Sequence, residues 1–119
     1  MKKILYVPHP ILRQKSLELK NIGQKDLLLA EEMMEIMMRA PGAGLAANQI
    51  GVLKKIVTIN IQDKEKNLDN KYVLFNPKII SFSKEKVIME EGCLSIPEQF
   101  ADIERPKEII VEYTSEKKN

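Results

Sequence analysis

The apolar positions of residues 25–39 recur with the period of an α-helix. They fall at i, i+4, i+7, i+8 and i+11, while acidic residues occupy much of the other side, which is the pattern of an amphipathic helix. The members of the apolar stripe are Leu29, Met33, Ile36, Met37 and Ala40. Pro41 and Gly42 are expected to end this helix. Because methionine fills irregular gaps in cores, we interpret the four methionines of this segment as core residues.

After Gly51 the apolar residues form short runs, which predict strands at 55–60, 72–75, 78–82, 86–89 and 107–113. Between them, residues 61–71 are polar and are predicted to form an exposed hairpin loop, Asn76 and Pro77 a break, 83–85 a turn and 91–97 a compact loop. The first 23 residues are predicted to be an arm with a short strand at 4–7 and a helical turn at 11–13. One helix followed by strands predicts an α+β fold with mainly antiparallel pairing.

The length of 119 residues corresponds to a single domain, which we place at 1–119. A net charge of +2 with scattered basic residues gives no indication of nucleic-acid binding, and no apolar run is long enough to predict a membrane span. One cysteine excludes an intrachain disulfide and suits a reducing compartment. One histidine and one cysteine cannot by themselves make a metal site of four His or Cys ligands.

The segment GAGLAANQIG at 42–51 is the first candidate motif. Its Gly-x-Gly-x-x-Ala spacing imitates a dinucleotide fingerprint, but a predicted helix precedes it and a strand follows it, which is the reverse of what that fingerprint needs. The alternative is a glycine-rich end of a helix in which small residues allow close backbone approach. On either interpretation Gln49 is an amide among apolar neighbours, able to tie the structure or to donate to a substrate carbonyl.

The segment EEGCLSIP at 90–97 is the second candidate motif. A lone cysteine such as Cys93 is more often a small buried apolar residue than a reactive thiol. A thiol hydrolase would need His9, which lies between two prolines in the predicted arm, and a metal site would need two or three further ligands.

Taken together, the two motifs resemble those of the peptide deformylase family. The flanking segments agree in the same order: the Pro-x-Pro-x-Leu-Arg arm, the acidic helix, Phe-Asn-Pro at 75–77 and Glu-Arg-Pro at 104–106. The resemblance implies hydrolysis of the N-formyl group of the initiator methionine of new polypeptides in the cytoplasm. It also implies a divalent metal, commonly iron(II), held by one Cys and by both His of an H-E-x-x-H helix. The metal would activate water and polarise the formyl oxygen.

The resemblance assigns roles by position. Cys93 matches the metal-binding cysteine, and Gln49 with the backbone N–H of Leu94 matches the two donors of the oxyanion hole. Gly44 matches a glycine whose backbone lines the substrate cleft. Glu91 and Arg105 match a carboxylate and an arginine that support the cysteine loop, with a simple surface ion pair as the alternative.

One family motif has no counterpart: the sequence contains no H-E-x-x-H, and no histidine follows His9. We therefore expect an incomplete deformylase-like domain that does not catalyse alone. The alternatives are a module that binds formyl-methionyl peptide without chemistry, and an enzyme completed in trans by a chain that carries H-E-x-x-H. We also expect marginal stability, with apolar faces of the strands and of the methionine-rich helix exposed. Either a second copy or a partner chain would cover these faces, or the core would be rearranged.

Overall fold

The computed structural model describes residues 2–6, 8–40, 42–63, 68–93, 95–106 and 109–115, and their side chains except at 62–63, 68–69, 89–93 and 96–104. It contains a 3₁₀ turn η1 (Pro10–Arg13), the helix α1 (Gln24–Arg39), the short strand β1 (Gly44–Ala46) and a second 3₁₀ turn η2 (Ala47–Ile50). The longer strands follow: β2 (Ile56–Asp63), β3 (Leu68–Phe82), β4 (Lys86–Cys93), β5 (Ile96–Pro106) and β6 (Ile109–Thr114). This is the predicted α+β fold.

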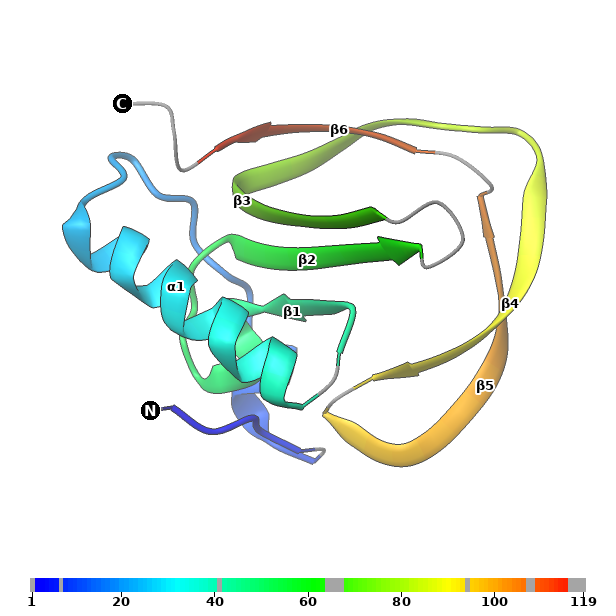
Figure 1. The fold of residues 1–119 in the computed structure, drawn as a ribbon, viewed down its shortest axis with the longest axis horizontal. Coiled ribbons are helices and arrows are strands. Elements are labelled where there is room, and N and C mark those ends of the chain that lie inside the picture. The colour runs from blue at the N-terminus through cyan, green and yellow to red at the C-terminus, as the bar shows by residue number, and fades with distance from the viewer. Residues whose placement is uncertain are drawn as a thin grey trace.

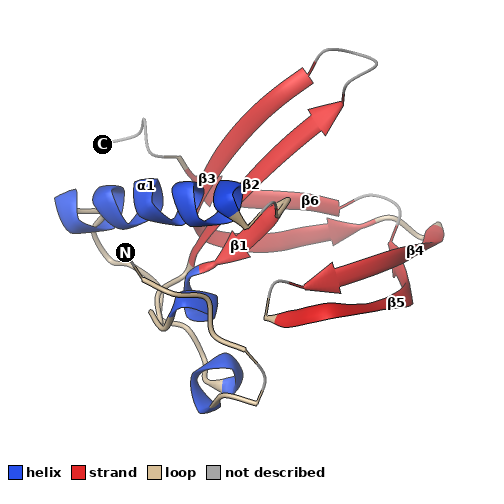
Figure 2. Cartoon of the chain, turned by 60° about the horizontal axis from the view of Figure 1, so that its bottom comes forward, coloured by secondary structure: helices blue, strands red, loops and turns tan. Residues whose placement is uncertain are grey.

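The strands form two antiparallel sheets. The first has the order β1-β2-β3-β6, and the second is the β4–β5 hairpin. Helix α1 packs on β1 and β2, and the hairpin curves away from the first sheet so that its tip returns toward the side of β1 and η2 (Figures 1 and 2). The chain therefore brings the segment after α1 and the connection between β4 and β5 to the same side of the molecule.

The core lies between α1 and the first sheet. The apolar stripe of the helix is buried, with Met33 and Met37 both 0% exposed, and it packs with Leu45, Ile56 and Phe75. The expectation that this face of the helix would be exposed is therefore wrong, because β1 and β2 cover it. The interpretation of the four methionines as core residues is confirmed for Met33 and Met37, while Met34 is partly buried against the core. It is wrong for Met38, which is 38% exposed because it lies off the buried stripe of the helix.

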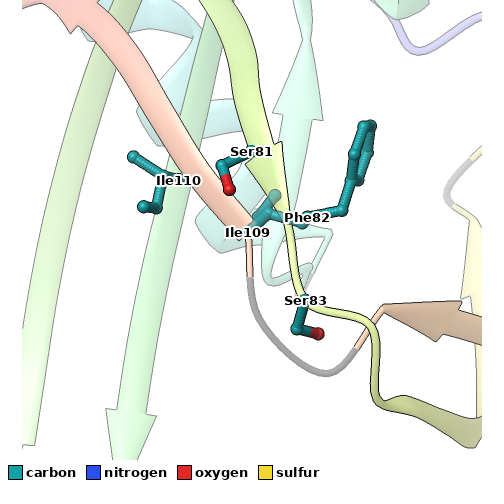
Figure 3. Close-up of a pocket in the computed structure, with 5 residues that line it drawn as sticks. All are labelled: Ser81, Phe82, Ser83, Ile109 and Ile110. Carbon is teal, nitrogen blue, oxygen red and sulfur yellow. The ribbon is translucent and has the colours of Figure 1, made fainter.

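Large apolar side chains are exposed instead on β3 and β6. Phe82 is 63% exposed, and Ile109 and Ile110 are also exposed. With Ser81 and Ser83 these residues line an open hollow of about 380 Å³, in which Phe82 and Ile110 extend away from each other (Figure 3). The expectation of exposed apolar strand surface is confirmed for this end of β3 and β6.

Several predicted boundaries are wrong, since strand pairing extends beyond the apolar runs. The predicted loop at 61–71 is mostly strand, because β2 and β3 stay paired from Ile56 opposite Phe75 to Asp63 opposite Leu68. The predicted break at Asn76 and Pro77 is an irregularity within one continuous β3. The predicted loop at 91–97 contains the end of β4 and the start of β5, which pair up to Cys93 opposite Ile96. The predicted strand at 4–7 is not formed over residues 4–6, where Leu5 N–H bonds to Gln49 O, outside any strand ladder.

Asn76 lies at the irregularity in β3 and connects this strand to the N-terminal arm. Its φ of 51° lies in the left-handed region, which asparagine tolerates better than most residues. Its side-chain amide accepts a hydrogen bond from Leu19 N and donates one to Leu19 O, both at 2.8 Å. The N-terminal arm is thereby fastened to the middle of the first sheet.

Candidate functional site

The 3₁₀ turn η2 holds Gln49 at the edge of the core. Ala47 and Ile50 are buried, and the turn ends at Gly51, whose φ of 86° is one that glycine adopts without strain. The N-terminal arm contacts the same turn, because Leu5 N–H donates to Gln49 O at 2.6 Å. The backbone at Gln49 is thus held from inside the core and from the arm.

The side chain of Gln49 joins the two candidate motifs. Its Oε1 accepts a hydrogen bond from Ala46 N at 2.9 Å, and its Nε2 donates to Ser95 Oγ at 3.2 Å. Ser95 is buried and lies between Cys93, the last residue of β4, and Ile96, the first of β5. Residues 46 positions apart in the sequence therefore meet, and the amide directs its donor group toward the cysteine-bearing end of β4.

Gly44 lies in β1 opposite Ile59 of β2 and is exposed. A Cβ added there would meet Thr58 O at 3.6 Å, an ordinary van der Waals distance. The packing of this chain therefore does not itself require glycine at this position. The open backbone is suited to an extended ligand that must approach closely.

The other predicted site residues are placed only in part. Cys93 and Glu91 lie in β4, with their side chains outside the described part of the structure, and Leu94 lies outside the described residues altogether. Arg105 of β5 is exposed and pairs with Val87, whereas Glu91 pairs with Ala101. Four ladder positions correspond to about 13 Å along a strand. The roles assigned to these four residues stay predictions.

His9 has a local structural use. Its Nδ1 accepts a hydrogen bond from Ile11 N at 3.2 Å and so caps η1. Within the described ranges no group of three His, Cys, Asp or Glu side chains is arranged to hold a metal ion. The donor set of the family, one Cys and two His, cannot be assembled from the one Cys and one His of this sequence. The residues present therefore do not fit a complete metal site.

Sequence reasoning missed Ser95 as a site residue and the arm as a support for Gln49. The signal available for Ser95 was a hydroxyl between two apolar residues, two positions after the cysteine. The contact between Leu5 and Gln49 had no sequence signal, since a backbone bond does not depend on the side chains.

Among the described helices, none is long and apolar enough to cross a membrane.

The architecture and the meeting of the two motifs define an α+β domain in which a glutamine amide faces a cysteine-bearing hairpin. The model of the polypeptide deformylase family matches residues 1–119. A peptide deformylase of Finegoldia magna is 50% identical over 105 residues, which are 88% of this chain and 62% of that protein. The crystal structure of peptide deformylase from Ehrlichia chaffeensis has a TM-score of 0.91 and 36% identity, covering 97% of this chain and 69% of that one.

A structure of a class I type b peptide deformylase from Acinetobacter baumannii with Met-Ala-Ser bound has a TM-score of 0.87 and 25% identity, covering 97% of this chain and 77% of that one. The chain belongs to the polypeptide deformylase family. It spans less than two thirds of the length of the first curated relatives that it matches, 62% and 64%.

Proposed function

We propose that this chain provides the substrate cleft and the oxyanion-stabilising amide of a peptide deformylase, which removes the N-formyl group from the initiator methionine of nascent polypeptides in the cytoplasm. The observation that carries the proposal is the hydrogen bond between Gln49 and Ser95. This bond orients an amide donor toward the end of β4 that carries Cys93. Family membership supplies the reaction class, and a relative with Met-Ala-Ser bound supports a methionyl peptide as ligand.

Hydrolysis of a formamide passes through a tetrahedral species whose oxygen carries negative charge. A donor that is already in place when this charge develops stabilises the transition state without reorganisation. Gln49 fits this role because its amide is held at both ends, by Ala46 N and by Ser95 Oγ. In the proposed site Leu94 supplies a second, backbone donor, and the open backbone at Gly44 supports the peptide.

The family implies a divalent metal ion, commonly iron(II), and Cys93 would be the ligand that this chain contributes. Because the two histidine ligands are not found within these 119 residues, we propose that the chain binds formylated peptide but does not hydrolyse it alone. Glu91 and Arg105 would support the segment around Cys93. Hydrolysis is then expected when a segment carrying H-E-x-x-H supplies the other two ligands, whether it belongs to the same or to another polypeptide.

The proposal is tested by titrating formyl-Met-Ala-Ser and Met-Ala-Ser into the 119-residue protein and measuring heat of binding. We expect saturable binding that favours the formylated peptide, and loss of that preference in Gln49→Ala. Equal affinity for the two peptides, or no binding of either, would show that this chain does not form a formyl-methionyl site.

A second measurement is formate release from formyl-Met-Ala-Ser, under anaerobic conditions with iron(II) or nickel(II). We expect none from the chain alone and turnover after a segment with H-E-x-x-H is added, abolished by Cys93→Ala. Turnover by the chain alone that is lost in Cys93→Ala would refute the statement that two ligands lie outside this sequence.

A further inference from the structure

Ser95 is a polar residue that is only 3% exposed, placed where the two motifs meet. Its Oγ accepts the hydrogen bond from Gln49 Nε2 at 3.2 Å. We propose that Ser95 is a positioning residue, which holds the amide of Gln49 in the orientation needed to donate to the formyl oxygen. The inference rests on the proposed function and extends it to a residue outside the predicted set of site residues.

Two contacts fix different properties of the amide. The backbone N–H of Ala46 can only donate, so the carbonyl oxygen of the Gln49 side chain must face it. The NH2 group then lies at the other end of the amide, where the Ser95 hydroxyl accepts from it. The bond from Ala46 therefore fixes the flip state of the amide, and the bond to Ser95 fixes the position of its NH2 group.

The backbone of η2 does not depend on Ser95. Leu5 N–H bonds to Gln49 O, Gly51 N–H bonds to Asn48 O, and Ala47 and Ile50 of the same turn are buried. Glutamine has three rotatable side-chain bonds, and holding it in one rotamer costs conformational entropy. Loss of the Ser95 hydroxyl removes an acceptor at the donor end of the amide and should make the orientation of the amide less restricted while the turn stays formed.

The first test reads the amide directly, by NMR of the ¹⁵N-labelled 119-residue protein. The two side-chain NH2 signals of Gln49 are assigned by their disappearance in Gln49→Glu. In Ser95→Ala we expect these signals to shift and the NH2 protons to exchange several-fold faster with water, because one acceptor of the NH2 group is lost. The backbone amide of Leu5, which bonds to Gln49 O, reports that the turn has persisted. Unchanged Gln49 NH2 signals in folded Ser95→Ala would overturn the proposal.

A matched pair of Ser95 variants separates the effect of the hydroxyl from the effect of altered packing at this buried position. Ser95→Thr and Ser95→Val give branched side chains of nearly the same shape, which differ in a hydroxyl against a methyl group, so steric strain is similar in the two variants. We expect the Thr variant to keep the wild-type Gln49 signals and the Val variant to lose them. If Thr and Val change these signals equally, the hydroxyl does not position the amide and the proposal fails.

Peptide binding separates this inference from the proposed function. If both hold, Ser95→Ala weakens binding of formyl-Met-Ala-Ser by about tenfold, close to 1.4 kcal/mol. In a Gln49→Ala background the same change should have little further effect, because the amide it positions is gone. If the wild-type protein does not bind the peptide, the proposed function fails, and the NMR comparison still decides whether Ser95 holds the amide. Additive losses in the double variant would contradict positioning.

Discussion

Asn76 provides the most quantitative test of how the N-terminal arm is held. Its amide makes two hydrogen bonds with the peptide groups of Leu19, both at 2.8 Å, and its backbone has a φ of 51°. A hydrogen bond of this kind contributes about 0.5–1.5 kcal/mol net, so the pair contributes about 1–3 kcal/mol. A residue with a Cβ in the left-handed region costs a further 1–2 kcal/mol, roughly, where its side chain makes no local hydrogen bond.

Three substitutions separate these contributions. Asn76→Gly removes both hydrogen bonds but adopts the backbone conformation without strain, so we expect a loss of about 1–3 kcal/mol. Asn76→Ala also introduces the strain and should be less stable than the Gly variant by about 1 kcal/mol. Asn76→Asp keeps the acceptor for Leu19 N–H and loses the donor to Leu19 O. It should also be destabilised, because its carboxylate then faces that carbonyl oxygen.

The assay is urea unfolding followed by far-ultraviolet circular dichroism, with the slope m compared between variants so that a shift of the midpoint reports stability. Equal stabilities of Asn76→Gly and Asn76→Ala would refute the argument from φ. A Gly variant as stable as the wild type would show that the bonds to Leu19 contribute nothing net.

Three further predictions address stability. First, burial raises the pKa of Asp26, but hydrogen bonds from Gly23 N and Lys54 Nζ and the charge of Lys54 lower it more, so the net pKa lies below its usual value of 3.8. A lowered folded-state pKa contributes stability that is complete above the unfolded pKa and is lost as pH falls through the folded pKa. Asp26→Asn should therefore be less stable than the wild type at pH 7, and this difference in the free energy of unfolding should shrink below about pH 4. A difference that does not change with pH in urea unfolding would contradict the prediction. Second, Gly51→Ala should lower the free energy of unfolding by about 1–2 kcal/mol, because φ is 86° at this residue. Gly44→Ala, at an exposed glycine with ordinary contacts, should lower it by less than about 1 kcal/mol in the same assay. Equal losses in the two variants would refute the argument from φ at Gly51. Third, Met33→Ala should lower the free energy of unfolding by about 2–5 kcal/mol in thermal or urea unfolding, since Met33 is fully buried. A loss below about 1 kcal/mol would mean that the core under α1 is loosely packed.

Much of the fold followed from local patterns. The helix was predicted at 25–39 and is observed at Gln24–Arg39, and the turn at 83–85 is present, closed by the bond from Ser83 Oγ to Glu85 O. Both features depend on residues close in sequence: the spacing of apolar residues in the first and a polar turn between two strands in the second.

The errors occurred where pairing between distant residues overrides local signals. Proline removes a ladder donor, so Pro77 was taken to end a strand, yet an irregularity in the pairing with β6 accommodates it. The strand β5 was not predicted at all, since Ile96–Pro106 has a proline near its start and scattered charges, and its structure comes from pairing with β4. Such pairing is a non-local property and leaves little local trace in one strand.

For the candidate site, the motifs predicted a chemistry but not its geometry. Nothing in the spacing of Gln49 and Ser95 requires them to meet, because the contact depends on the path of the whole β4–β5 hairpin back toward η2 (Figure 2). Sequence resemblance placed both motifs in one site, and the structure adds which atoms join them. It also adds a reason for a hydroxyl at position 95.

The proposed function makes substrate recognition separable from hydrolysis in this chain. The amide of Gln49 is held by Ala46 N and Ser95 Oγ, and neither contact involves a metal ligand of the proposed site. Activation of water by a divalent metal ion would, in contrast, need two histidine ligands that the sequence does not contain. Discrimination between formylated and free methionyl peptides should therefore survive under conditions in which no formate is released. A preference for the formyl group that arose only together with turnover would instead mean that the metal site, and not the oriented amide, recognises the formyl group.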